Sequence, residues 1–200
     1  MERHERNDLI LGHAAELFAE KGIAATTVRD IAGRAGILSG SLYHYFPSKD
    51  AMADRIVTLY LDDLVSDYQT FVAADLDART ALTGLVMASS RVSRTHAYAS
   101  EIYQRETAYL RQLPSYEEIR VAARTIRDSW LTVLERGIEA GALRSDLPVE
   151  LLYVLIRDAV WLTLRSFAPT EEIDVDRNAK AIVSVFLDGA TARPDESDLL

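Results

Sequence analysis

Residues 36–52 of this chain, GILSGSLYHYFPSKDAM, gather side chains of types that can form hydrogen bonds with phosphate oxygens or with the edges of bases. Small residues let a helix approach a DNA groove closely, and serine hydroxyls and first-turn N–H groups can bond to DNA. Tyr43 and His44 are expected to project outward, where a phenol and an imidazole can bond to phosphates. The segment therefore predicts a short helix presented to nucleic acid, and its small members are Ser39, Gly40 and Ser41.

Each of these residues also has an ordinary structural interpretation. Tyr43 alone is more often half-buried packing than a ligand contact, and His44 can simply cap another group. Lys49, at the start of the next helix, offers a point charge to the DNA backbone, but a lone lysine is usually just solvated. The DNA hypothesis therefore depends on the ordered set and on the segment TTVRDIAGRAG that precedes it.

A second candidate site lies in the segment PVELLYVLIRDAVWLTLRSF, which is apolar on most sides. Arg157, Trp161 and Arg165 recur every four residues and so share one helix face. An arginine in apolar surroundings needs an anionic or aromatic partner. Asp158 is one alternative partner, Trp161 can instead fill the core or a subunit interface, and Arg165 can extend to solvent. The functional hypothesis, which the spacing alone does not favour over these alternatives, places Arg157 and Trp161 against an anionic ligand.

Several kinds of site are excluded by composition. The chain has no cysteine, and its four histidines have no metal-ligand spacing, so neither a disulfide nor a metal site is expected. No Ser-His-Asp arrangement, glycine-rich phosphate loop or supported carboxylate pair is present, so we expect no enzyme, no catalytic residue and no cofactor. The N-terminus is charged and no apolar run is long enough to span a membrane, which predicts a cytoplasmic protein.

The net charge of −9 does not contradict a DNA partner, because the acidity is uneven. Residues 1–55 contain seven Lys and Arg against eight Asp and Glu, whereas residues 56–200 contain fifteen against twenty-three. A DNA-binding head needs local phosphate contacts, and these do not require a basic protein.

Helical signals dominate the whole chain, and no strand-like alternation of useful length is present. Gly22, Gly36 and Pro47 supply stops, while Thr26 or Thr27, Ser39 and Ser48 supply N-caps. Three short helices in under fifty residues have helix-turn-helix spacing. The expected helices are 9–20, 28–35, 40–46, 48–74, 78–96, 97–112, 115–140, 148–167 and 174–190.

The predicted class is therefore all-α, with about nine helices. We expect a helix-turn-helix head over residues 1–47 and a larger helical domain for effector binding and dimerisation over residues 48–190. Residues 191–200 are polar and are expected to be a frayed tail.

The segment TTVRDIAGRAGILSGSLYHYFPSKDAM resembles the DNA-binding head of TetR-family transcriptional regulators. The resemblance implies a ligand-responsive repressor that binds an inverted-repeat operator in double-stranded DNA. It also implies a homodimer held by the last two long helices and a ligand pocket in the C-terminal helices. The DNA contacts that it implies are Thr27, Ser39, Gly40, Ser41, Tyr43, His44 and Lys49.

A narrower resemblance joins AGILSGSLYHYFPSK and RDAVW to actinobacterial TetR-type repressors of steroid (cholesterol) ring catabolism. It implies an effector that is a coenzyme A thioester of a ring-opened or bicyclic intermediate, with Arg157 and Trp161 in its site. An effector of the fatty acyl-CoA or drug-like kind is the alternative. A more distant alternative is a helical interaction protein whose head does not bind DNA.

Overall fold

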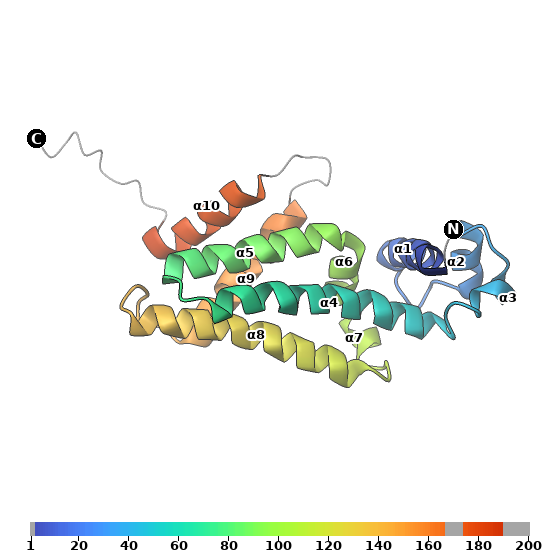
Figure 1. Cartoon of the computed structure of the whole chain (residues 1–200), viewed down its shortest axis with the longest axis horizontal. Coiled ribbons are helices and arrows are strands. Elements are labelled where there is room, and N and C mark those ends of the chain that lie inside the picture. The colour runs from blue at the N-terminus through green and yellow to red at the C-terminus, as the bar shows by residue number, and fades with distance from the viewer. Residues whose placement is uncertain (1–2, 167–173, 190–200) are drawn as a thin grey trace, which may run out of the picture. The chain divides into compact units, whose positions relative to one another are not determined.

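The computed structural model describes residues 3–166 and 174–189, without the side chains of residues 3 and 164–166. Every regular element in these ranges is a helix and none is a strand, which confirms the predicted all-α class (Figure 1). The predicted frayed tail, 191–200, and the side chain of Arg165 lie outside the described residues. No described helix combines the length and the apolar character that crossing a bilayer requires.

Ten helices occur in the described ranges, one more than the sequence predicted. They are α1 (Arg3–Lys21), α2 (Val28–Arg34), α3 (Ser39–Leu42), α4 (Lys49–Ala73), α5 (Ala78–Thr95), α6 (Ala97–Arg105), α7 (Thr107–Leu110), α8 (Tyr116–Glu139), α9 (Val149–Ser166) and α10 (Val175–Asp188).

The extra helix arises because the expected helix 97–112 is interrupted. Glu106 leaves the helical conformation, with φ −99° and ψ 24°, and it ends α6 and starts α7. Its carbonyl accepts hydrogen bonds from the N–H groups of Tyr109 and Leu110, so a new short helix begins there. The prediction of one continuous helix was wrong at this residue.

The chain divides into two compact units. The first contains Met1–Asp67 and Arg91–Ile126, and the second contains Tyr68–Ser90 and Arg127–Leu200. The helices α1, α2 and α3 therefore belong to the first unit, and α9 and α10 to the second. The long helices α4, α5 and α8 each contribute residues to both units.

Local signals explain how the head folds. Gly22 and Gly36 have φ values of +84° and +66°, a backbone region that glycine enters without strain, and they follow the ends of α1 and α2. Thr27 caps α2 in a capping box: its hydroxyl accepts from the N–H of Asp30, and the Asp30 carboxylate accepts from the N–H of Thr27. Thr26 is instead buried, and its hydroxyl donates to the carbonyl of Gly22.

The third helix is shorter than predicted and has a different cap. Leu38 is the N-cap residue of α3 and Ser39 is already helical, so the prediction that Ser39 caps this helix was wrong. The carbonyl of Leu38 accepts from the N–H groups of Ser41 and Leu42, which draws Ser39 inside the helix. After Leu42 the backbone continues as a turn as far as Phe46, ahead of Pro47.

Each unit contains a pair of neighbouring aromatic rings of which at least one is buried. In the first, the buried ring of Tyr60 lies 6.1 Å from the ring of Tyr103, centroid to centroid. In the second, the buried Tyr68 meets the edge of Trp130 at 5.9 Å, and its hydroxyl lies 2.6 Å from the hydroxyl of Ser89. Each buried phenol thus has a polar partner or an aromatic neighbour, as buried aromatics with a hydroxyl require.

Candidate functional site

The face of α3 and the turn that follows it presents the predicted DNA-contacting side chains. Leu42 and Phe46 are buried and so anchor this element to the head. Tyr43 and His44 are exposed, as expected, and so is Gly40, whereas Ser39 and Ser41 are half-buried. The fold therefore brings small, hydroxyl-bearing and aromatic residues to one short surface element.

Thr27 is exposed at the start of α2, but its hydroxyl is engaged in the capping box. It donates to the carboxylate of Asp30 at 2.8 Å and accepts from the Asp30 N–H at 3.1 Å. The hydrogen bond from the N–H of Thr27 is the main cause that lowers the pKa of Asp30 below its ordinary value, and the bond from the Thr27 hydroxyl lowers it further. Thr27 thus stabilises the start of α2, and contact with DNA through Thr27 stays a prediction.

Lys49 lies at the start of α4 and has polar partners in the head. Its ammonium donates to three carbonyl oxygens, those of Ile23 at 2.6 Å, Ala24 at 3.3 Å and Thr26 at 2.9 Å. An ammonium has three donors, so all of them are engaged in holding the turn between α1 and α2. The sequence did not indicate this role, because these carbonyls precede Lys49 by more than twenty residues.

Replacing Lys49 with Ala is therefore expected to lower the free energy of unfolding by about 1–3 kcal/mol, because three carbonyls lose a charged donor. Thermal and urea unfolding at fixed protein concentration would measure this. Lys21→Ala is the matched control, since it removes the same charge from an exposed position in the same head. If stability is unchanged and the salt dependence of DNA binding loses about one phosphate contact, Lys49 binds phosphate instead.

The first turns of α4 are also tied to α7 and to the start of α8. The hydroxyl of Tyr109 donates to the carboxylate of Asp50 at 2.6 Å. The hydroxyl of Ser115 donates to the carboxylate of Asp54. Burial, the hydrogen bond to Asp50 and the nearby carboxylates together raise the pKa of Tyr109 to about 12. These contacts join α4, the helix that follows α3, to residues about sixty positions away.

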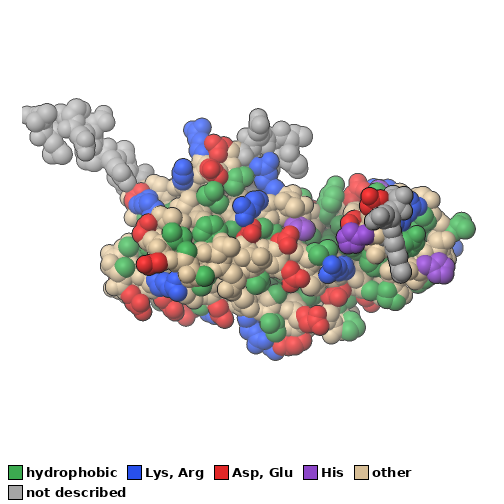
Figure 2. All heavy atoms as spheres, viewed as in Figure 1, with side chains coloured by type: hydrophobic (Ala, Val, Ile, Leu, Met, Phe, Trp, Pro, Cys, Tyr) green, Lys and Arg blue, Asp and Glu red, His purple; other side chains and the backbone are tan. Residues whose placement is uncertain are grey.

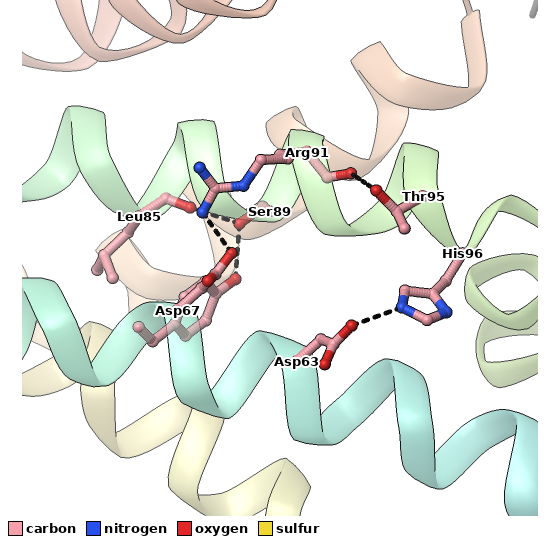
Figure 3. Close-up of polar contacts among 8 residues, drawn as sticks. Asp63, Asp67, Leu85, Ser89, Arg91, Thr95 and His96 are labelled. Carbon is pink, nitrogen blue, oxygen red and sulfur yellow. Dashed lines mark hydrogen bonds and ion pairs between the residues drawn. The ribbon is translucent and has the colours of Figure 1, made fainter.

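A hollow of about 290 Å³ lies between α4 and α5 in the first unit, and Figure 3 shows the polar contacts of these two helices. Its charged groups are paired with one another: the Arg91 guanidinium is 2.6 Å from the Asp67 carboxylate, and beside it the His96 imidazole is 2.7 Å from Asp63. Neither Arg157 nor Trp161 lines it. The lining residues are Asp63, Ser66, Asp67, Arg91, Val92 and Thr95. Its polar walls do not suit the apolar body of a steroid-like molecule.

Arg157 and Trp161 lie one turn apart on α9, in the second unit, and both are half-buried. The Arg157 guanidinium pairs with the adjacent Asp158, with Nε 2.9 Å from Oδ1, and its central carbon lies 5.2 Å from the centroid of the Tyr153 ring. Burial disfavours the charge of Arg157, but hydrogen bonds to Asp158 and Tyr153 outweigh it and raise the pKa. The alternative partner that the sequence suggested, Asp158, is therefore in contact.

This ion pair leaves Arg157 able to change partners. Asp158 is largely exposed, and exposed ion pairs contribute only about 0–1 kcal/mol. A better-placed anion with planar, paired acceptors can therefore compete for the guanidinium.

Within the described ranges, no three His, Asp or Glu side chains gather in a way that could hold a metal ion.

Apolar side chains remain exposed along α9 and α10. They include Leu162, with 65% of its surface exposed, and Leu155, with 47%. Leu152, Ile182 and Phe186 of the same two helices are half-buried within one chain. Contiguous apolar surface of this kind marks protein–protein contacts. The exposed members are Leu151, Val154, Leu155, Leu162 and Val185.

Comparison with known proteins places these features in context. Residues 10–56 match the family model described as bacterial regulatory proteins, tetR family. The HTH-type transcriptional repressor KstR2 of Rhodococcus jostii (strain RHA1) is 43% identical, over 92% of this chain and 90% of the relative. The HTH-type transcriptional repressor KstR2 of Mycolicibacterium smegmatis is 38% identical, over 93% of this chain and 91% of that relative.

A solved structure has the same fold over almost the whole chain. The structure of the ketosteroid transcriptional regulator KstR2 of Mycobacterium tuberculosis matches with a TM-score of 0.85 and 39% identity. The match covers 94% of this chain and 96% of the other. The similarity therefore extends well beyond the head, into the helices of the second unit.

Proposed function

Because this chain belongs to the TetR family of helix-turn-helix transcriptional repressors, we propose that a coenzyme A thioester of a steroid-degradation intermediate releases it from DNA. TetR-family regulators bind DNA and act as dimers. The proposed DNA contacts are the surface residues of and around α3, namely Thr27, Ser39, Gly40, Ser41, Tyr43 and His44, with Lys49 either at a phosphate or supporting the turn beneath them. The proposed operator is an inverted repeat whose half-sites face successive major grooves about 34 Å apart.

The observation that carries the effector proposal is the placement of Arg157. Its guanidinium is half-buried over an aromatic ring, and its carboxylate partner is exposed and easily replaced. A carboxylate, phosphate or thioester carbonyl can accept paired bonds from this group, and the half-buried Trp161 one turn on can cover an apolar ring. The relative of known structure is described as a ketosteroid regulator, and this favours a steroid-derived body.

Release from DNA requires that the effector prefer a conformation in which the two heads no longer match the groove spacing. The bonds from Tyr109 to Asp50 and from Ser115 to Asp54 support such a change. They tie the first turns of α4, directly after the recognition element, to α7 and the start of α8. A displacement of α7 would therefore pull on the helix that carries the head.

A mobility-shift titration tests the proposal. The probe is DNA from upstream of the gene, and the competing ligands are coenzyme A thioesters of ring-opened steroid acids, the same acids without coenzyme A, palmitoyl-CoA and free coenzyme A. We expect release by the steroid thioesters alone. Release by palmitoyl-CoA at equal or lower concentration would replace the steroid proposal with a fatty acyl one.

A further inference from the structure

Leu38 is an apolar side chain in an unfavourable place. It is 79% exposed, the highest value among the large hydrophobic residues that the structure describes as exposed. Figure 2 shows hydrophobic side chains at the outer edge of the head, over the segment between α2 and α3. Leu42 is fully buried and supplies the core contact of this element, so the packing of the head does not explain Leu38.

Helix capping does not explain Leu38 either. It occupies the N-cap position of α3, in an extended conformation, and it makes no side-chain cap bond. Ser, Thr, Asp and Asn are preferred there, and leucine is among the least favoured residues. A residue that departs from two local rules at once, with no gain within the fold, is typical of a functional position.

Gly40, two residues on, gives a second observation. A Cβ atom built on Gly40 would meet no other atom of the protein within 4 Å, so the fold itself does not need a glycine there. Glycine in a helix is unfavourable relative to alanine, and a common reason for one is the close approach of another molecule to the backbone. Gly40 therefore leaves the backbone beside Leu38 open to the close approach of another molecule.

We propose that Leu38 contacts the C5-methyl group of a thymine in each operator half-site and so contributes to the choice of sequence. This inference rests on the proposed DNA-binding role of α3. The first residues of a recognition helix meet base edges in the major groove, where all the other recognition features are polar donors and acceptors. The thymine methyl is the one group there that matches an exposed leucine.

Uracil substitution in the operator tests the contact directly. The operator is first selected from random-sequence duplex DNA with the wild-type protein, and each of its thymines is then replaced with deoxyuridine, which removes one methyl group and keeps every hydrogen-bonding atom. Burying one methyl-sized group corresponds to about fourfold in affinity. We expect wild-type binding to fall about fourfold at one thymine in each half-site, and about 15-fold when both are replaced.

Leu38→Ala removes the contact from both half-sites, so it should bind the unmodified operator about 15-fold more weakly than the wild type. Replacing the same two thymines with uracil should then weaken its binding no further. Such non-additivity is the signature of a direct contact. Leu9→Ala, at an exposed leucine of α1 in the same head, is the matched control and should keep the full uracil effect.

Two results would overturn the inference while leaving the proposed function intact. In the first, uracil at each position weakens binding by the wild type and by Leu38→Ala to the same extent. In the second, Leu38→Ala loses the same affinity for every DNA sequence, which would place Leu38 on the sugar-phosphate backbone or on another protein. If the wild-type protein selects no sequence at all, the proposed function fails and this inference fails with it.

Discussion

Replacing both Leu155 and Leu162 with Glu is expected to convert the dimer to monomers and to weaken operator binding by at least about 100-fold. Both side chains lie in the exposed apolar surface of α9. Burying such surface stabilises by roughly 25 cal/mol per Å² before the costs of association, and a carboxylate buried there lacks a partner. Two linked heads bind roughly 100- to 10,000-fold more tightly than one.

Sedimentation at micromolar concentration measures the first effect, and a mobility shift on the inverted repeat measures the second. Leu76→Glu is the control for the kind of substitution, because Leu76 is an exposed leucine between α4 and α5 and gains the charge that each replaced leucine of α9 gains. We expect it to remain dimeric and bound to the operator. A double variant that stays dimeric would show that the subunits meet through another surface.

Replacing Arg157 with Ala is expected to leave the protein dimeric and bound to DNA while raising the effector concentration needed for release by about 10- to 150-fold. A hydrogen bond to a charged group contributes roughly 1.5–3 kcal/mol, which corresponds to that range. Titration of the DNA complex with the steroid thioester measures the shift. Trp161→Ala should raise the required concentration too, because it removes the surface that covers the apolar ring.

Asp158→Asn is the matched control for Arg157, since it weakens the ion pair without removing the guanidinium. We expect unchanged or easier release, because the effector no longer competes with a carboxylate. Arg157→Lys retains the charge but not the planar fork, so a full response would mean that charge alone is sufficient. If Arg157→Ala and Asp158→Asn impair release equally, or if Arg157→Ala unfolds while its folded fraction responds normally, the pair is structural.

The local signals of the sequence were sufficient for most of the head. Gly22, Gly36 and Ser48 mark helix ends correctly because a positive φ angle and a capping bond each involve only a few neighbouring residues. The burial of Leu42 and Phe46 fits their spacing, because residues four positions apart lie on the same side of a helical turn. The cap of α3 was predicted one residue too late, since helix boundaries depend on backbone bonds that several starting positions can satisfy.

The tertiary structure decided which partner each charged or hydroxyl side chain meets. Lys49 reads as a free cation in the sequence, but its ammonium reaches the carbonyls of Ile23, Ala24 and Thr26. Contacts over such separations leave no periodic pattern, because they depend on how helices pack and on which side-chain rotamer fits the space.

The two candidate sites show the same division. The sequence by itself determined the all-helical class, the short helix after Gly36 and the shared helix face of Arg157 and Trp161, because helical period and turn chemistry are local properties. Only the tertiary structure showed that Arg157 turns back to the adjacent Asp158 over Tyr153, and that the exposed residue ahead of α3 is Leu38. Burial and partner choice are properties of the packed chain, and residues distant in the sequence determine them together.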